Sequence, residues 1–309
     1  MKTRIPFLSL MTVIVFACAN IGAQQVADPD FNPPIAKPAY AEGRGPLVMI
    51  DESHSNFHTA EGRYKPFADL LRRDGYRVQP FTAKFSKESL KGCDILVIAN
   101  AQAEGEREDG SPPHPSAFTD EEVASVREWV RGGGSLFLIV DHMPFPGAAE
   151  KLGAAFGAKW SNGYAIDPAA RGPMVFKRSD GSLADHPVTN GRDASERVDS
   201  VATFTGSAFQ AEGASPLLTF KGDIVSLTTM GAGELKPDTP RVGVKNWQQG
   251  ALLRAGKGRV ALFGEAAMFS AQLAGPQRAP MGMNAPVASQ NYRLLLNVLH
   301  WLSGLLGEK

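Results

Sequence analysis

Four short apolar runs constrain most strongly what this chain can fold into. They are LVMI, ILVIA, SLFLIV and RVALF, beginning at Leu47, Ile95, Ser135 and Arg259. A continuous apolar run of four to six residues is typical of a strand that is buried on both faces, as in a parallel sheet covered by helices. Helical patterns separate the first three runs, so the order of elements predicts an α/β domain with a mostly parallel sheet.

Local signals support helices between and after these runs. Residues 64–73 have apolar positions at helical spacing, with Pro66 in the first turn. Residues 119–130 begin with a capping box, in which Thr119 and Glu122 satisfy each other's backbone groups. A last helix is expected over 289–302. Residues 159–240 contain short strand-like runs among Gly, Pro and Asp, which predicts a β-rich insertion.

The composition excludes some classes of partner. Of 309 residues, 43% are hydrophobic and 21% are charged, which is ordinary for a globular domain. Lys plus Arg and Asp plus Glu both number 32, so no net field attracts a polyanion. No run of basic residues interleaved with aromatics offers a track for phosphates, and nucleic acid is not an expected partner.

The N-terminus predicts export. Residues 1–23 have a basic start, an apolar middle and small residues before a cleavage point, as a signal peptide does. The alternative is a lipoprotein attached to the membrane through Cys18. Either route predicts a periplasmic or secreted protein. Residues 24–45 contain several prolines and are expected to form an extended linker, with the domain covering 46–302. Cys93 is then the only remaining thiol, so no internal disulfide forms.

Polar side chains follow directly after the apolar runs. In an open α/β sheet, the carboxyl ends of the strands form the edge where ligands bind. This rule gathers seven candidate ligand-binding residues, which are Asp51, His54, His58, Asn100, Asp141, His142 and Glu265. Carboxylates brought together at one edge need a compensating cation, a shared proton or access to water.

Two interpretations of this set stay open. A divalent metal would compensate the carboxylates, with imidazole and carboxylate ligands that suit zinc, manganese or iron. Alternatively, Asp51 and its neighbours accept backbone N–H groups in a turn, and His54 is a satisfied structural partner. His300 is expected to be structural. Two polar segments, 101–118 and 274–289, are expected to be flaps over the same edge.

Ordered sequence patches resemble a known superfamily. They are D-x-x-H-x-N from Asp51, RGGGSLFLIVDH from Arg131, DHPVTNG from Asp185, GKGRVALFGEAAMFS from Gly256, and QNYRLLLNVLHWL from Gln290. Together they resemble the class I glutamine amidotransferase-like superfamily. Within it, they are most similar to an exported bacterial domain of unknown function that is related to the gliding-motility and intraflagellar-transport domain. The resemblance implies a flavodoxin-like, doubly wound sheet.

The resemblance also implies where a nucleophile would lie. Active amidotransferases have a cysteine on the turn after the strand that corresponds to SLFLIV, and a His-x-Glu pair later. Here that turn holds Asp141 and His142, and no histidine is followed two residues later by Glu. We therefore expect no glutaminase activity and a domain that binds a small polar or carbohydrate ligand. The alternatives are a metal-dependent hydrolase using the Asp/His cluster and, last, a metal-free glycosidase with two carboxyl groups.

Overall fold

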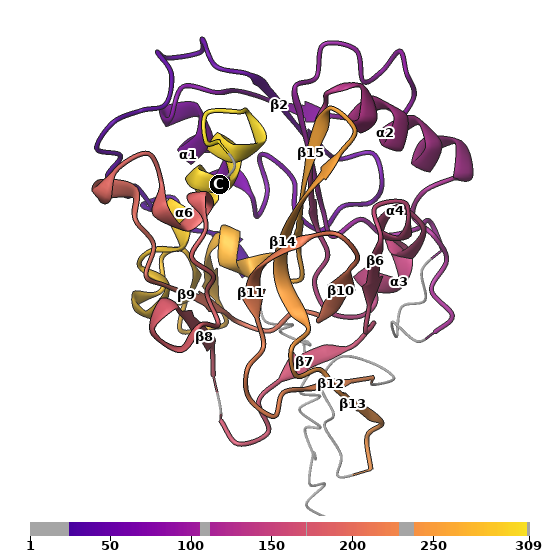
Figure 1. Cartoon of the computed structure of the whole chain (residues 1–309), viewed down its shortest axis with the longest axis vertical. Coiled ribbons are helices and arrows are strands. Elements are labelled where there is room, and N and C mark those ends of the chain that lie inside the picture. The colour runs from indigo at the N-terminus through magenta and orange to yellow at the C-terminus, as the bar shows by residue number, and fades with distance from the viewer. Residues whose placement is uncertain (1–24, 106–111, 171, 229–237, 308–309) are drawn as a thin grey trace, which may run out of the picture.

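The structure of the chain is a computed structural model that describes residues 25–105, 112–170, 172–228 and 238–307 (Figure 1). The predicted signal peptide and Cys18 lie outside these residues. The predicted α/β class is confirmed in its coarse form, because the chain forms a large mixed sheet with few helices. No helix in the described ranges is long and apolar enough to cross a membrane.

The large sheet has nine strands, with the order β3-β2-β4-β5-β15-β14-β10-β6 and β11 paired to β14. Its first five strands are parallel: β3 (Arg77–Phe81), β2 (Leu47–Asp51), β4 (Ile95–Ala99), β5 (Ser135–Ile139) and β15 (Gly258–Phe263). The others pair antiparallel: β14 (Gln248–Ala255), β10 (Phe209–Ala211), β6 (Ala158–Trp160) and β11 (Ser215–Thr219). The four apolar runs are thus neighbours in the middle of one sheet.

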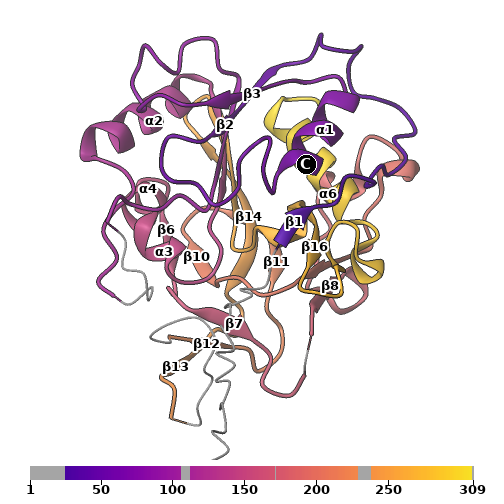
Figure 2. The ribbon, with the colours of Figure 1, turned by 180° about the vertical axis from the view of Figure 1, so that it is seen from behind.

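Helices lie on both faces of this sheet (Figures 1 and 2). One core joins alternate strand residues such as Ile50 and Phe137 to α1 (Lys65–Arg73) and α6 (Asn291–Leu302). The other joins residues such as Leu138 to α2 (Asp120–Gly132) and α4 (Glu150–Ala154), beside α3 (Phe145–Ala148). The central strands β2, β4, β5 and β15 therefore bury both of their sides, which explains their apolar sequences. The capping box of Thr119 and Glu122 is present at the start of α2.

Smaller sheets surround the large one. The strands β7 (Tyr164–Ile166), β12 (Val225–Leu227) and β13 (Arg241–Gly243) form one, and β8 (Met174–Lys177) and β9 (Ser200–Thr203) form another. All of these strands except β13, together with β6, β10 and β11, lie in or at the edge of the segment 159–240, which is predicted to be rich in β-strands. Short helices complete the fold: α5 (Pro187–Asn190), η1 (Arg178–Asp180), η2 (Ala194–Glu196), η3 (Ala267–Phe269) and η4 (Pro286–Ala288).

The segment from 25 to 45 differs from the expected extended linker. Its first residues form β1 (Gln25–Ala27), which pairs with β16 (Ala271–Ala274), and Phe31, Ile35 and Tyr40 pack against the core. Apolar side chains between the prolines anchor the segment, although they follow no regular period.

The segment 274–289 also differs from the expected flap. β17 (Ala279–Gly282) pairs with β16, so the two strands form a hairpin held in a three-stranded sheet with β1. Backbone hydrogen bonds within the hairpin and between β16 and β1 leave it little freedom to open. Part of the other expected flap, residues 106–111, lies outside the described residues.

Candidate functional site

The carboxyl ends of four parallel strands place four polar residues in a row. In the order β2, β4, β5, β15 they are Asp51, Asn100, Asp141 and Glu265. All four are buried. This strand order places the four residues at one edge of the sheet, where the sequence predicted them. Their contacts divide them into two groups.

The first group is centred on Asp51, which holds its own loop. Its Oδ1 accepts hydrogen bonds from the backbone N–H of Ser53 at 3.1 Å and from the Ser53 hydroxyl at 2.8 Å. Its Oδ2 lies 2.9 Å from Nδ1 of His54 and accepts from Nδ2 of Asn56 at 3.1 Å. With both oxygens occupied, Asp51 organises the turn after β2, as the structural interpretation predicts.

His54 joins this loop to helix α2. Its Nε2 lies 2.9 Å from Oε1 of Glu122, and its ring packs against both Phe85 and Phe118, with centroid separations of 4.6 and 4.7 Å. Burial lowers the pKa of His54, but hydrogen bonds and charges of Asp51 and Glu122 raise it more, so the net pKa is above 6.5. The two neighbouring carboxyl groups therefore favour the protonated form of the His54 ring.

The second group is centred on Asp141. Its backbone N–H donates to Oδ1 of Asn100 at 2.9 Å, which connects the ends of β4 and β5. Its carboxyl oxygens accept from the backbone N–H of His142 at 2.8 Å and of Ala266 at 3.2 Å. Asn100 has a φ of 50°, a left-handed conformation that asparagine tolerates better than most residues. Asp141 thus connects β4, β5 and the turn after β15.

Glu265 lies beside Asp141 and is shielded from water. Its oxygens accept from the backbone N–H groups of Ala267 at 2.9 Å and Met268 at 2.7 Å, which begin η3. Burial and the charge of Asp141 raise the pKa of Glu265 well above its usual value, despite these donors. Burial and the same two carboxyl groups also raise the pKa of Tyr64. Burial and the neighbouring carboxyl group of Asp141 therefore both favour the protonated form of Glu265.

His58 supplies a buried donor to this group. Nδ2 of Asn100 lies 3.3 Å from Nδ1 of His58. Since Oδ1 of Asn100 accepts from Asp141, its amide nitrogen donates, so Nδ1 of His58 accepts and Nε2 carries the proton. That buried Nε2 has no hydrogen-bond partner among the described residues. Burial and the charge of Arg63 lower the pKa of His58 to about 3, so the ring is neutral.

An aromatic rim lies next to these buried groups. His142 stacks on Tyr164 with ring centroids 4.3 Å apart, and Phe145 lies 6.1 Å from His142 and 6.0 Å from Phe57. Phe57 is 39% exposed, and the guanidinium of Arg63 lies 3.7 Å from its ring centroid. Burial and the charge of Asp141 raise the pKa of Tyr164.

A cavity of about 910 Å³ adjoins the second group. Its walls include Ala165, which follows Tyr164, and Phe204 and Thr205. The backbone of Phe204 also makes a hydrogen bond to Glu265. The buried carboxyl group thus lies just behind one wall of a space large enough for a small ligand.

The structure separates the candidate residues that the sequence grouped together. His58, Asn100, Asp141, His142 and Glu265 belong to one connected cluster, whereas Asp51 and His54 face their own loop and α2. His300 is buried and pairs with Asp74 at 2.7 Å, in agreement with its predicted structural role.

Sequence reasoning missed three participants. Tyr64 and Tyr164 carry no motif, and Glu122 was explained completely by its capping box. The one feature that could have indicated Tyr64 is its position in the sequence, a short way after the end of the first apolar run. Within the described part of the chain, no three His, Cys, Asp or Glu side chains are grouped so that they could hold a metal ion. The metal-site hypothesis therefore has no geometric support in those residues.

Comparisons with known proteins show the fold alone. No protein-family model and no curated protein sequence matches this chain. Among solved structures, the mmIFT52 N-terminal domain is 13% identical, with a TM-score of 0.57 over 84% of this chain and 97% of that domain. Cytoplasmic protein STM3548 from Salmonella typhimurium is 16% identical, with a TM-score of 0.51 over 85% of this chain and 100% of that protein.

A putative ThuA-like protein from Bacteroides uniformis is 14% identical, with a TM-score of 0.45 over 85% of this chain and 93% of that protein. The similarity to the mmIFT52 domain and to STM3548 defines the class of this chain as a mixed α/β domain with a large mixed sheet. The intraflagellar-transport part of the predicted resemblance is thereby supported at the level of fold.

Proposed function

We propose that this chain is an exported, amidotransferase-like domain without glutaminase activity, which binds a small carbohydrate or similar polar ligand at the carboxyl edge of its sheet. The observation that carries the proposal is the buried Nε2–H donor of His58, without a partner in the described residues, in the cluster that contains Asp141. A buried donor without a partner is costly unless a ligand or water satisfies it.

The arrangement of the parallel strands supports an amidotransferase-like core. Numbered along the chain, the first five core strands have the order 2-1-3-4-5, which is the order of flavodoxin-like doubly wound sheets. Helices on both faces are consistent with that arrangement. In such sheets, ligands bind beyond the carboxyl ends of the strands.

The absence of a suitable thiol supports a function other than glutaminase. The turn after β5 holds Asp141 and His142, and the sequence has only two cysteines. Cys93 precedes β4, at the opposite edge, and burial raises its pKa to about 12. A thiol with so high a pKa is almost entirely protonated at neutral pH and is a poor nucleophile.

The chemistry of the cluster suits a ligand rich in hydroxyl groups. Asp141 is an acceptor, His58 is a neutral donor, and the aromatic rings of His142, Tyr164 and Phe57 offer apolar faces at the rim. Ligand sites commonly combine such apolar walls with a few convergent polar groups. A sugar presents both alternating hydroxyl groups and apolar C–H faces, so it matches both components. Export to the periplasm or beyond, which rests on the sequence of residues 1–23, would expose the domain to such ligands.

Titration calorimetry with a panel of mono- and oligosaccharides tests the proposal. We expect at least one sugar to bind, and we expect His142→Ala to weaken it by about tenfold through loss of the stacked rim. Glu128→Gln, on the exposed surface of α2 at the other edge, is the matched control. If no sugar binds, or if both variants bind the sugar with equal affinity, the proposal of a carbohydrate site at the carboxyl edge is wrong.

A further inference from the structure

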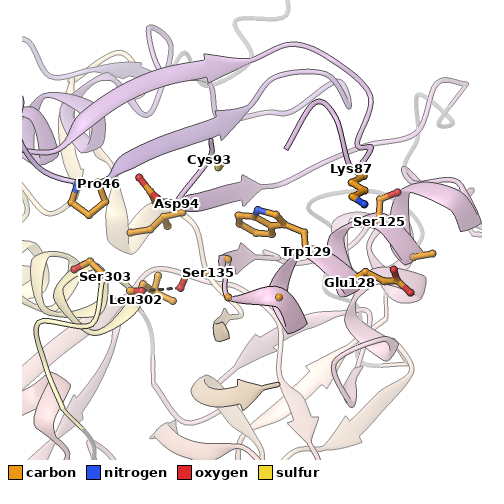
Figure 3. A pocket seen from close by; sticks show the side chains of 15 residues that line it. Pro46, Lys87, Cys93, Asp94, Ser125, Glu128, Trp129, Ser135, Leu302 and Ser303 are labelled. Atoms are coloured by element: carbon orange, nitrogen blue, oxygen red, sulfur yellow. Dashed lines mark hydrogen bonds between the residues drawn. The ribbon is translucent and has the colours of Figure 1, made fainter. Parts of the chain in front are cut away.

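A second cavity, of about 930 Å³, lies at the amino edge of the sheet. Its walls include Ile95 and Ser135, which begin β4 and β5, whereas Asp141 follows the other end of β5. The ends of helices α2 and α6 complete the walls (Figure 3). The cavity is therefore separate from the carboxyl-edge site, and a ligand bound in it would be independent of the function proposed above.

Trp129 lines this cavity, and Figure 3 shows its indole ring between Asp94 and Lys87. A Cβ atom on Gly134 would come within 2.2 Å of the ring, so only glycine lets the indole lie against the chain at this point. Trp129 is in the last turn of α2, which fixes its backbone. A large aromatic ring at a fixed position in a cavity is a preformed surface for a ligand.

The charged residues of the cavity are predominantly acidic. The lining contains the carboxyl groups of Asp94 and Glu128 and one basic side chain, Lys87. Asp94 is 53% exposed at its side chain, and its Oδ2 accepts from the backbone N–H of Leu47 at 2.7 Å, 3.8 Å from the guanidinium of Arg77. Figure 3 shows Lys87 beside Ser125, across Trp129 from Asp94. The lining thus has more carboxyl than ammonium groups, although Arg77 offsets part of the charge of Asp94.

Two helices add to this polarity because both end at the cavity. The lining includes Gly132 and Gly133 at the end of α2, and Leu302 and Ser303 at the end of α6. The carboxyl end of a helix carries a partial negative charge and favours cations. An indole ring also attracts cations through its negative face, more strongly than the other aromatic rings do.

We propose that this cavity binds a small organic ammonium ion, with its cationic group over the indole of Trp129 and toward Asp94. The three contributions that favour a cation have independent origins: the ring quadrupole, the carboxylates and the helix ends. A compact anion would meet two carboxylates and only one ammonium group. A neutral ligand would gain nothing from the charges.

Calorimetry with choline and with 3,3-dimethylbutan-1-ol tests the proposal on the intact chain. The two molecules have the same shape and the same hydroxyl group, and only choline is charged. We expect choline to bind about tenfold more tightly than the alcohol. Equal binding of the two molecules would overturn the proposal. The absence of any heat from choline, even at concentrations on the order of tens of millimolar, would overturn it as well.

Three variants locate the binding. Trp129→Leu keeps an apolar side chain but removes the ring, and we expect it to weaken choline binding by about tenfold. Glu128→Gln should weaken binding by about two- to threefold, and Lys87→Met should strengthen it by a similar factor, because both charges are exposed and screened. Circular dichroism confirms folding of each. Choline binding that is unchanged in both charge variants, or stronger binding by a neutral sugar, would contradict a cation site.

Discussion

The Nε2 atom of His54 lies 2.9 Å from Oε1 of Glu122, although 68 residues separate them in the sequence. The other ring nitrogen lies 2.9 Å from Asp51. The imidazole ring of His54 thus connects the loop after β2 to the first turn of α2, with one ring nitrogen toward each. These two contacts give a structural role to Asp51 and His54, which the sequence analysis placed among the candidate ligand-binding residues.

Replacing Glu122 with Gln should destabilise the fold. The variant leaves the buried ring of His54 with one neighbouring carboxyl group instead of two and weakens the N-terminal cap of α2. We expect a loss of about 2–3 kcal/mol in the free energy of unfolding, measured with urea. Glu121→Gln, an exposed change in the same helical turn, is the matched control and should cost less than about 0.5 kcal/mol. Equal effects would show that the contact with His54 contributes nothing.

His54 should make stability decrease on the alkaline side. Its folded pKa is raised above the unfolded value of 6.5, so its contribution is complete below pH 6.5 and is lost as the pH rises through the higher folded pKa. Urea unfolding at pH 6, 7, 8 and 9 measures this decline. The His54→Asn variant should lack this component. A decline of the same size in that variant would assign it to other groups.

His58 should act in the opposite direction. Its folded pKa is lowered to about 3, so its contribution is complete above pH 6.5 and is lost as the pH falls from 6.5 toward 3. The His58→Asn variant should therefore lose less stability between pH 7 and pH 4 than the native chain, although it is less stable at pH 7. The comparison of the two unfolding curves isolates His58 from the carboxyl groups, which are common to both.

The carboxyl group of Glu265 should titrate well above pH 4.5. Carbon-13 NMR of the labelled carboxyl groups follows it directly, with exposed Glu128 as the reference resonance. In Asp141→Asn the pKa of Glu265 should decrease, because the neighbouring negative charge is removed while burial remains. A pKa near 4.5 in the native chain would indicate that the three backbone donors outweigh burial.

The N-terminal segment should contribute to stability. Tyr40 packs against the core, with its ring centroid 5.2 Å from that of Tyr76 in an edge-on arrangement. We expect Tyr40→Ala to cost about 2–3 kcal/mol by thermal or urea unfolding. Phe57→Ala removes a ring that is 39% exposed and should cost much less. If the two changes cost the same, residues 25–45 are the loose linker that their proline content predicts.

Local sequence was sufficient where one segment decides its own conformation. The four apolar runs became strands of the central sheet, and the capping box of Thr119 and Glu122 formed at the start of α2, because each depends on neighbours a few residues away. The linker prediction for 24–45 failed to anticipate β1 and the packing of Tyr40, since these contacts are made with distant residues. The predicted flap at 274–289 is a paired hairpin for the same reason.

For the candidate site, the sequence determined that Asp51, Asn100, Asp141 and Glu265 each follow a strand, because an apolar run that ends in a polar residue is visible in one dimension. The tertiary structure alone decided which of them are neighbours. The pairing of β4 with β5 places Asn100 beside Asp141, and the two form a hydrogen bond. The ring of His54, in contrast, contacts both Asp51 and Glu122 of α2. Side-chain direction and burial depend on atoms brought together from distant segments, and no local pattern encodes them.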